Sequence, residues 1–445
     1  MPDRNELQKK LKEYKDGNPF RSEDFEALLI GFARLWEGQK QDWDGNNLAY
    51  LLRKAKRFKE AEEICIQVEE QNPGFAPIHT QHAWALFGLH FTDLDRERLS
   101  EANYPQLKQL FQRIRDMDVP GRYSPEKNIF QNVLKGLWSI PSRPIGRVLD
   151  WLSLFDPMEL PHEVSVFQVN GKHRESPSPR ESWYSHMSKS LQAREAWEEC
   201  RKSCEQALEN IPQFSGNNPD GFFFRYRRAQ CFAAMGQHDK AVPLFRGLLE
   251  KKGEWYIFRD IALSLRAMAE EKQAFENAVQ GMLRFQPFAK LENAWKLLFL
   301  LADFYRDDKQ VELSHKHLEL CALLHRKAGW EIKPELESAL EEAGIDADSL
   351  DPATLGRRYN ELKDAWQQKA LDSLASKPGT VLKLLPKGGG FLRSEDGKEF
   401  HFSASASKSA KPPLSEGEQV VFHYDAKQVV ERGKKASAVK VTRAK

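Results

Sequence analysis

The residues best suited to chemistry in this chain are three metal-ligating side chains on one predicted helix. His317, Cys321 and His325 recur every four positions, so they lie along a single face of that helix. A structural zinc site needs four ligands at tetrahedral angles, and one helix face does not supply them. Cys200 and Cys204 have the same spacing, but they fall among the small residues expected in a helical core. We interpret both groups as packing residues and predict neither a metal nor a cofactor.

Motifs that position a catalytic group are missing from the sequence. It contains no GxxxxGKS/T phosphate loop, no GxGxxG, no HExxH and no GxSxG. A nucleophilic Ser or Cys also needs a base and an orienting group beside it in space. Each of the five cysteines instead falls inside an amphipathic helical pattern. We therefore predict that the protein is not an enzyme.

The cysteines and the apolar pattern indicate the cellular location of the protein. An odd number of cysteines without framework spacing is typical of a reduced, cytoplasmic protein. The charged N-terminal residues contain no apolar signal-peptide core, and no apolar run approaches the ~18 residues that span a membrane. We expect a cytoplasmic protein without a membrane partner.

The charge of this 445-residue chain is unevenly distributed, although its net value is only +2. Residues 377–445 hold 14 Lys and Arg against 7 Asp and Glu, whereas residues 1–376 hold 53 against 58. This asymmetry locates any electrostatic attraction for phosphate on the C-terminal segment. A solvated basic tail is the simpler alternative.

Upstream of the basic segment the apolar pattern is helical, and one spacing recurs within it. A small residue in one helix is followed twelve positions later by a small residue in the next, which lets two antiparallel helices pack closely. The clearest helix–turn–helix units cover residues 42–73 and 222–253, the second with Gly236 at its turn. The small-residue pairs are Ala49 and Ala61, Ser188 and Cys200, Ala229 and Ala241, Ala262 and Ala274, and Ala302 and Ser314.

These units resemble the tetratricopeptide repeat, a helix–turn–helix of about 34 residues. Gly45 and Arg225 stand where that family has a bulky aromatic. The resemblance implies stacked helix pairs with an inner groove that takes a peptide or a protein surface. The alternative is that the same aromatics pack against the next helix. The implied groove residues are Trp43, Asn46, Tyr50, Arg53 and Lys54 in the first unit and Phe223, Tyr226 and Gln230 in the unit at 222–253.

The rest of the helical region is less regular and suggests domain limits. Helical patterns near residues 103–116, 126–138 and 144–155 are broken by turns, and residues 169–180 are typical of an exposed loop. A helix that begins at Asp351-Pro352 carries Tyr359, Leu362 and Trp366 on one face. We predict an N-terminal helical lobe over 1–165, helical repeats over 181–350, a connecting helix over 351–376 and a β-domain over 377–445.

The terminal β-domain is predicted from short runs of Val, Leu and Phe separated by Gly, Pro and Ser. Residues 394–397, Ser-Glu-Asp-Gly, form a hairpin turn between its second and third strands. Five short strands with a basic surface favour a small closed barrel of OB type. The fold class is therefore mainly α, a helical-repeat superhelix followed by a five-stranded β-barrel. The predicted strands cover residues 379–385, 389–394, 398–403, 418–425 and 436–442.

The β-domain resembles the cold-shock domain over residues 377–443, because several short motifs occur in that family's order. Residues 387–392 are Lys-Gly-Gly-Gly-Phe-Leu, residues 401–404 are His-Phe-Ser-Ala, and residues 414–422 are Leu-Ser-Glu-Gly-Glu-Gln-Val-Val-Phe. The resemblance implies binding of single-stranded RNA or DNA, with bases stacked on exposed rings and phosphates held by Lys and Arg. It assigns stacking to Phe391, His401 and Phe402 and phosphate contacts to Lys383, Lys387, Arg393 and Lys398.

The chain departs from the cold-shock family at points that bear on the binding face. Gly389 replaces an aromatic of the first motif, and Glu399 replaces an outward Phe of the third strand. Strict alternation places Phe402 with Phe400 and opposite His401, whereas the motif match turns both His401 and Phe402 outward and needs a bulge. With fewer rings, the barrel is expected to bind weakly alone and to gain from avidity.

Together these features predict a non-enzymatic adaptor. Its barrel binds single-stranded nucleic acid, RNA in preference to DNA, and its helical repeats bind a protein partner. One alternative is a protein–protein scaffold or inhibitor whose barrel no longer binds nucleic acid. Another is an enzyme or toxin with a site within residues 100–180. The identity of the partner and the oligomeric state are left open.

Overall fold

The computed structural model describes residues 3–17, 21–285, 288–386, 388–407, 410, 412–424 and 436–444. The chain forms two compact units, residues 1–228 and 229–445, which are described separately. Helix α11 (Phe222–Ala234) spans this junction in the sequence. No helix among the described residues is long and apolar enough to cross a membrane. The predicted domain limits near residues 165, 181 and 351 stay predictions.

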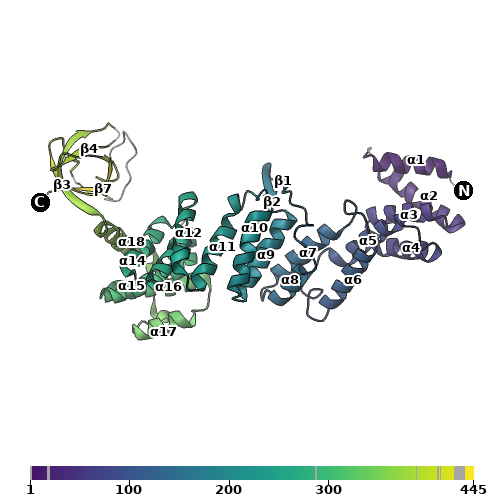
Figure 1. Cartoon of the computed structure of the whole chain (residues 1–445), viewed down its shortest axis with the longest axis horizontal. Coiled ribbons are helices and arrows are strands. Elements are labelled where there is room, and N and C mark those ends of the chain that lie inside the picture. Colours follow the sequence, from purple (N-terminus) through teal and green to yellow (C-terminus); the bar gives the residue numbers. More distant parts are fainter. Residues whose placement is uncertain are drawn as a thin grey trace. The chain divides into compact units, whose positions relative to one another are not determined.

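The first unit is built almost entirely from α-helices (Figure 1). One hydrophobic core surrounds Phe32 and Trp36, and another surrounds Phe111 and Trp151. Its elements before α11 are α1 (Arg4–Lys15), α2 (Ser22–Gln39), α3 (Asp42–Lys54), α4 (Phe58–Gln71), α5 (Pro77–Leu86), the π-helical turn η1 (Phe87–Phe91), α6 (Tyr104–Asp116), α7 (Glu126–Ser139), α8 (Ile145–Leu152), β1 (Ser165–Val169), β2 (Lys172–Ser176), α9 (Pro179–Ala193), α10 (Trp197–Asn210) and the 3-10 turn η2 (Pro219–Gly221).

The second unit continues the helices and ends in β-strands (Figure 1). Large side chains such as Phe245, Tyr305 and Trp366 are buried in its helical part. Its elements after α11 are α12 (His238–Lys251), α13 (Trp255–Ala267), α14 (Glu271–Arg284), η3 (Phe288–Ala294), α15 (Trp295–Asp307), α16 (Val311–Ala328), α17 (Pro334–Glu342), η4 (Ala347–Ser349), η5 (Pro352–Thr354), α18 (Leu355–Asp372), β3 (Ala375–Leu384), β4 (Gly389–Ser394), β5 (Glu399–Ser403), β6 (Gln419–Tyr424) and β7 (Ala436–Arg443).

The small residues spaced twelve positions apart lie where consecutive helices pack together. None of the ten side chains is more than 3 % exposed, and each pair joins two successive helices such as α13 and α14. The predicted helix–turn–helix repeats are therefore confirmed. Gly45 belongs to the same packing, because a Cβ there would lie 2.5 Å from Val68 Cγ2 and 2.8 Å from the Trp36 ring. The Trp36 ring, on α2, fills the space that a side chain at position 45 would need.

The irregular helices predicted between residues 103 and 155 are confirmed as α6, α7 and α8. The loop predicted over residues 169–180 is wrong in part, because β1 and β2 pair there as an antiparallel hairpin. Asn170 and Gly171 form its two-residue turn with positive φ angles of 51° and 72°. An Asn-Gly pair is a strong hairpin signal, so the sequence does contain the information that predicts this hairpin. Strand β1 is exposed throughout, as expected of a surface segment.

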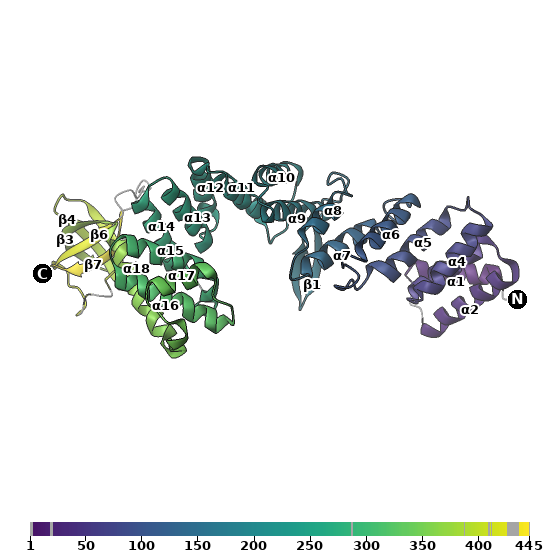
Figure 2. The same ribbon diagram turned by 90° about the horizontal axis from the view of Figure 1, so that it is seen from below.

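The helix predicted after Asp351 is confirmed as α18, which follows the turn η5. Asp351 caps that turn, because its Oδ1 accepts the backbone N–H of Ala353 at 2.9 Å. Leu362 and Trp366 are fully buried, and Tyr359 meets Trp366 edge-on with ring centroids 5.8 Å apart. The helix packs against α14 and α16 (Figure 2), so it is part of the helical body as well as the link to the strands.

The face of α16 that carries His317, Cys321 and His325 is a core face. All three side chains are buried, and the described part of the chain holds no group of His, Cys, Asp or Glu arranged for a metal ion. Both ring nitrogens of His317 are used within the protein: Nδ1 donates to the Leu313 carbonyl at 2.7 Å, and Nε2 accepts the indole N–H of Trp366 at 2.9 Å. Burial lowers the pKa of His317 to about 4, so the ring is neutral.

The predicted barrel is confirmed as a closed sheet of strand order β3-β4-β5-β7-β6, in which β6 pairs back to β3. Strands β5 and β7 run parallel, and the other neighbours run antiparallel. The interior is filled by Leu392, Phe400, Phe402, Phe422 and Val441 among others. Strand bounds agree with the prediction to within a few residues, and β4 agrees at both ends. Helical repeats followed by a small β-barrel are thus the fold of this chain.

Candidate nucleic-acid interface

The register of the barrel aligns four residues in one row across its outer surface. Lys383 pairs with Phe391, Phe391 pairs with His401, and His401 pairs with Ser437. Paired residues on neighbouring strands point to the same side of a sheet. Leu392, which follows Phe391 along β4, is fully buried in the barrel. The row therefore belongs to the outer face of β3, β4, β5 and β7.

A bulge in β3 turns Lys383 onto this outer face. The pairing of β3 with β4 shifts register between Val381 and Lys383. Val381 is buried in the core, and strict alternation would have sent Lys383 inward as well. The extra residue, Leu382, reverses the direction, so Lys383 is exposed. Lys383 thus lies at the surface, and its phosphate contact stays a prediction.

Two rings occupy the centre of the row. Phe391 and His401 are half-buried, and their rings meet at 63° with centroids 5.5 Å apart. Each ring keeps part of its surface open, on which a base can stack for ~1–3 kcal/mol. Phe391 and His401 thus lie on the outer face, and base stacking on them stays a prediction.

The outward position expected for Phe402 is wrong. Its side chain is 0 % exposed and lies in the barrel core with Phe400 and Phe422. Strands β4 and β5 pair without interruption from Gly389 opposite Ser403 to the far end of the hairpin, so no bulge turns Phe402 outward. The alternation of the strand prevails because it buries a large ring inside the barrel. Phe402 cannot stack on a base in this fold.

The glycines ahead of Phe391 are required by close backbone approach. Gly389 has a φ of 78°, and a Cβ there would lie 2.4 Å from the carbonyl oxygen of Phe402. A Cβ on Gly390 would lie 2.1 Å from the carbonyl oxygen of Lys383. Neither position accepts a side chain. The absence of the cold-shock aromatic at Gly389 is therefore a property of this backbone.

The predicted phosphate contacts differ in how available they are. Lys383 and Lys398 are exposed, and neither forms an ion pair with a described residue. Arg393 is held by Glu399, whose Oε1 lies 2.8 Å from Arg393 Nη2. This carboxylate competes with a phosphate for the guanidinium. Lys387 lies outside the described residues.

Much of the positive charge of the barrel segment is neutralised or falls on positions that are not described. Lys377 pairs with Asp396 at 2.7 Å, and Arg443 pairs with Glu418. With the Arg393 pair, three of the described cations of the barrel are each bound to a carboxylate. The Lys and Arg residues outside the described positions are Lys387, Lys408, Lys411, Lys427, Arg432, Lys434, Lys435 and Lys445.

Three of the groove residues predicted in the first repeat unit are wholly or partly buried within the chain. Asn46 is buried at 6 % exposure. The ammonium of Lys15, on α1, lies 4.7 Å from the ring centroid of the half-buried Tyr50. Arg53 donates through Nη2 to Gln81 Oε1 at 2.8 Å, and burial lowers the pKa of Arg53 to about 10. Asn46, Tyr50 and Arg53 thus have contacts within the chain, and their predicted role in binding a protein stays a prediction.

The remaining predicted groove residues divide into engaged and exposed side chains. Tyr226 is half-buried, and the amide of Gln230 donates to Asp260 Oδ2 at 3.0 Å. Their predicted role in binding a protein is untested by these contacts. The side chains left at the surface are Trp43, at 57 % exposure, Phe223, at 40 %, and Lys54.

Two features of the barrel face extend the set of predicted residues. Ser437 joins the row only through the parallel pairing of β5 with β7, which strand order along the sequence does not reveal. The pairing of Arg393 with Glu399 can be inferred from the sequence, because the two residues flank the predicted turn at 394–397 and face each other across its hairpin. Hairpin register would have marked Arg393 as a neutralised cation.

No family model matches the chain, and no curated protein matches it. Similar solved structures include aspartyl phosphate phosphatase F from Bacillus subtilis, at 12 % identity and a TM-score of 0.40, over 75 % of this chain and 88 % of that one. The human IFIT1 dimer with PPP-AAAA has 14 % identity and a TM-score of 0.34 over 83 % and 82 %. The C-terminal part of a TPR repeat-containing protein from Cytophaga hutchinsonii has 13 % identity and a TM-score of 0.37 over 66 % and 99 %. At such identities and scores the similarity concerns the fold alone and assigns no ligand.

Proposed function

We propose that the C-terminal barrel is a cold-shock-like OB domain that binds single-stranded nucleic acid, RNA in preference to DNA. The observation that carries this proposal is the row formed by Lys383, Phe391 and His401, in which two surface rings lie beside an exposed cation. Bases stack on the two rings, and Lys383 and Lys398 meet the phosphates. The closed five-stranded order, with its parallel pair of β5 and β7, suits a small OB barrel.

Two stacking rings support only a modest affinity. At ~1–3 kcal/mol for each base, they fall short of the roughly 8 kcal/mol that corresponds to micromolar binding. The barrel therefore benefits from a second attachment that raises the local concentration of its ligand. In this proposal the helical repeats provide that attachment by binding a protein partner, and the protein acts as a non-enzymatic adaptor.

The protein-binding part of the proposal rests on exposed aromatic side chains in the helical repeats. Trp43 and Phe223 are 57 % and 40 % exposed. Aromatic residues are enriched at protein interfaces and depleted from ordinary surface. The orientation of the Trp43 ring is also fixed by packing, because the ring meets Phe75 edge-on with centroids 5.2 Å apart. A ring that is already positioned loses little conformational entropy when it binds.

A second candidate function is a protein–protein scaffold or inhibitor whose barrel has no nucleic-acid ligand. The observation that favours it is the ion pair of Arg393 with Glu399, which places a carboxylate on the proposed binding face. Burial of Phe402 also leaves that face with one ring fewer than the cold-shock pattern implies.

A fluorescence anisotropy titration of the full chain with a labelled oligouridylate tests the proposal. We expect binding that weakens steeply as salt is raised. Phe391→Ala should weaken it about 5- to 100-fold, the equivalent of one lost stack. Phe167→Ala is the matched control, because it removes a phenyl ring of 47 % exposure from β1. Absence of salt-dependent binding, or an equal loss in both variants, would favour the scaffold.

A further inference from the structure

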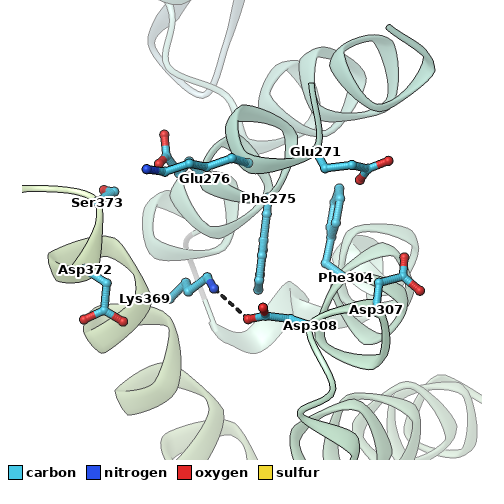
Figure 3. Close-up of a pocket in the computed structure, with 10 residues that line it drawn as sticks. Glu271, Phe275, Glu276, Phe304, Asp307, Asp308, Lys369, Asp372 and Ser373 are labelled. Carbon is cyan, nitrogen blue, oxygen red and sulfur yellow. Dashed lines mark hydrogen bonds and ion pairs between the residues drawn. The ribbon is translucent and has the colours of Figure 1, made fainter. Parts of the chain in front are cut away.

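A pocket of about 450 Å³ opens in the second unit between α14, α15 and α18 (Figure 3). Its floor is apolar and consists of Phe275 and Phe304, both nearly buried. Its rim is charged and predominantly acidic. The rim residues are Glu271, Glu276, Asp307, Asp308 and Asp372, with Lys272 and Lys369 as the cations and Ser373 beside them.

One basic side chain of the protein already uses this floor. The rings of Phe275 and Phe304 are stacked, with centroids 5.2 Å apart and 8° between their planes. The ammonium of Lys369 lies 4.3 Å from the Phe275 centroid and 2.8 Å from Asp308 Oδ2 (Figure 3). A cation over an aromatic face with a carboxylate beside it is favoured by both cation–π attraction and ion pairing.

Arg266 repeats this arrangement at the second ring. Its guanidinium carbon lies 5.0 Å from the Phe304 centroid, and its Nη2 lies 2.6 Å from Asp307 Oδ2. Its Nε also lies 3.8 Å from Glu271 Oε2. Two of the five rim carboxylates are left over, because across the described residues neither Glu276 nor Asp372 forms an ion pair with a Lys or Arg. The pocket thus has two carboxylates, those of Glu276 and Asp372, that no Lys or Arg of the described residues neutralises.

Tyr305 adds an independent observation beside the floor. Its ring meets Phe275 edge-on with centroids 4.9 Å apart, and the side chain is 1 % exposed. Within the described structure its hydroxyl has no hydrogen-bond partner. Burial, and then the negative charges of Asp308 and Asp372, raise the pKa of Tyr305. A buried hydroxyl without a partner costs free energy.

We propose that this pocket binds a basic peptide segment of a protein partner. An Arg or Lys side chain of that peptide takes the place of Lys369 over Phe275 and directs its charged head to Glu276 and Asp372. Five carboxylates outnumber Lys272, Lys369 and Arg266, so the pocket repels an acidic peptide or a phosphate backbone, and the apolar floor suits the stem of a long basic side chain. The inference does not depend on nucleic-acid binding by the barrel.

Anisotropy of the full chain with a fluorescein-labelled peptide, in which two arginines flank a leucine, tests this site. The control peptide carries citrulline in place of arginine, which keeps the shape and removes the charge. We expect the arginine peptide to bind about 10-fold more tightly at low salt and to lose this advantage at high salt. Equal binding of the two peptides at low salt would overturn the proposal.

Variants of the rim locate the binding. Glu276→Gln combined with Asp372→Asn should weaken the arginine peptide about 5- to 10-fold. Glu337→Gln combined with Glu341→Gln is the matched control, because it removes two charges from exposed positions on α17 that do not line the pocket. Lys369→Gln should tighten binding about 2- to 5-fold, since it releases Asp308 and one face of Phe275. An unchanged affinity in the rim pair, or an equal loss in the control pair, would place the peptide elsewhere.

Discussion

The indole N–H of Trp366 donates to Nε2 of His317 at 2.9 Å, a buried hydrogen bond that joins α18 to α16. Both side chains are fully buried. Because Nε2 accepts this bond, the proton of the neutral ring lies on Nδ1, which donates to Leu313. The last helix before the barrel is therefore anchored in the helical body by a specific polar contact as well as by apolar packing.

Trp366→Phe should destabilise the second unit by about 1–3 kcal/mol from the unpaired imidazole nitrogen alone. The phenyl ring fills most of the indole volume but cannot donate a hydrogen bond. Urea unfolding followed by far-UV circular dichroism measures the change. Trp330→Phe is the matched control, because Trp330 is 43 % exposed and its replacement should change stability little. Equal effects of the two substitutions would show that the bond is unimportant.

Stability should fall as the pH is lowered from about 6.5 towards 4. Burial lowers the pKa of His317 to about 4, whereas the unfolded chain titrates near the ordinary value of 6.5. Between these values the unfolded state binds more protons, so the stabilising contribution is complete above 6.5 and is lost on acidification. The pKa of His186 is also lowered to about 4, chiefly by burial, so this residue contributes to the same loss of stability.

The pH effect is isolated by comparing the wild type with His317→Gln. In the acid range the free energy of unfolding of the wild type should depend on pH more steeply by up to about 1.4 kcal/mol per pH unit, the equivalent of one proton. His315→Gln serves as the control, because it removes an imidazole on α16 that is not buried. Parallel pH profiles for the wild type and His317→Gln would contradict the assignment.

Gly390→Ala should disrupt the barrel, since its Cβ would lie 2.1 Å from the carbonyl oxygen of Lys383. The backbone of β3 has to move, and we expect a cost of at least about 2 kcal/mol from overpacking and a lost strand contact. Amide hydrogen exchange in β3 and β4 detects this directly. In Gly247→Ala the added methyl group meets no atom within 4 Å and lies in α12, so that variant should be neutral or slightly more stable. Native exchange rates in Gly390→Ala would disprove the close approach.

Glu399→Gln should strengthen nucleic-acid binding if the barrel face is used as proposed. It removes a negative charge from the face and releases Arg393, now held at 2.8 Å, for a phosphate. One added phosphate contact makes the slope of log affinity against log salt steeper by about 0.7 for a single strand. Glu395→Gln, at an exposed position in the hairpin turn, provides the control. A slope that does not change in Glu399→Gln would remove Arg393 from the interface.

Local signals in the sequence are enough to predict most elements of this fold. The twelve-residue spacing identifies helix pairs because the two small residues that let helices approach lie close together in the sequence. The ends of β4 are predicted because glycines mark its start and the turn at 394–397 marks its end. The error at Phe402 arises where a motif match competes with strand alternation, and alternation decides because it buries a phenyl ring.

Contacts between distant residues account for what the sequence does not reveal. Arg4 pairs with the buried Asp44 at 2.7 Å, and this contact brings α1 to the first repeat unit, where Lys15 also reaches the Tyr50 ring. Nothing local to Tyr50 indicates that another helix approaches it. The pocket beside Phe275 likewise depends on Lys369, which lies far along the chain. Such sites follow from tertiary packing, which periodicity does not specify.

Photocrosslinking of the full chain to an oligouridylate that carries 4-thiouridine tests the central claim most directly. Mass spectrometry of the crosslinked peptides identifies the residues that touch the bases. The account predicts crosslinks within residues 389–403, at Phe391 or His401, which disappear at high salt. Crosslinks confined to residues before 375, or none in the barrel at low salt, would contradict it.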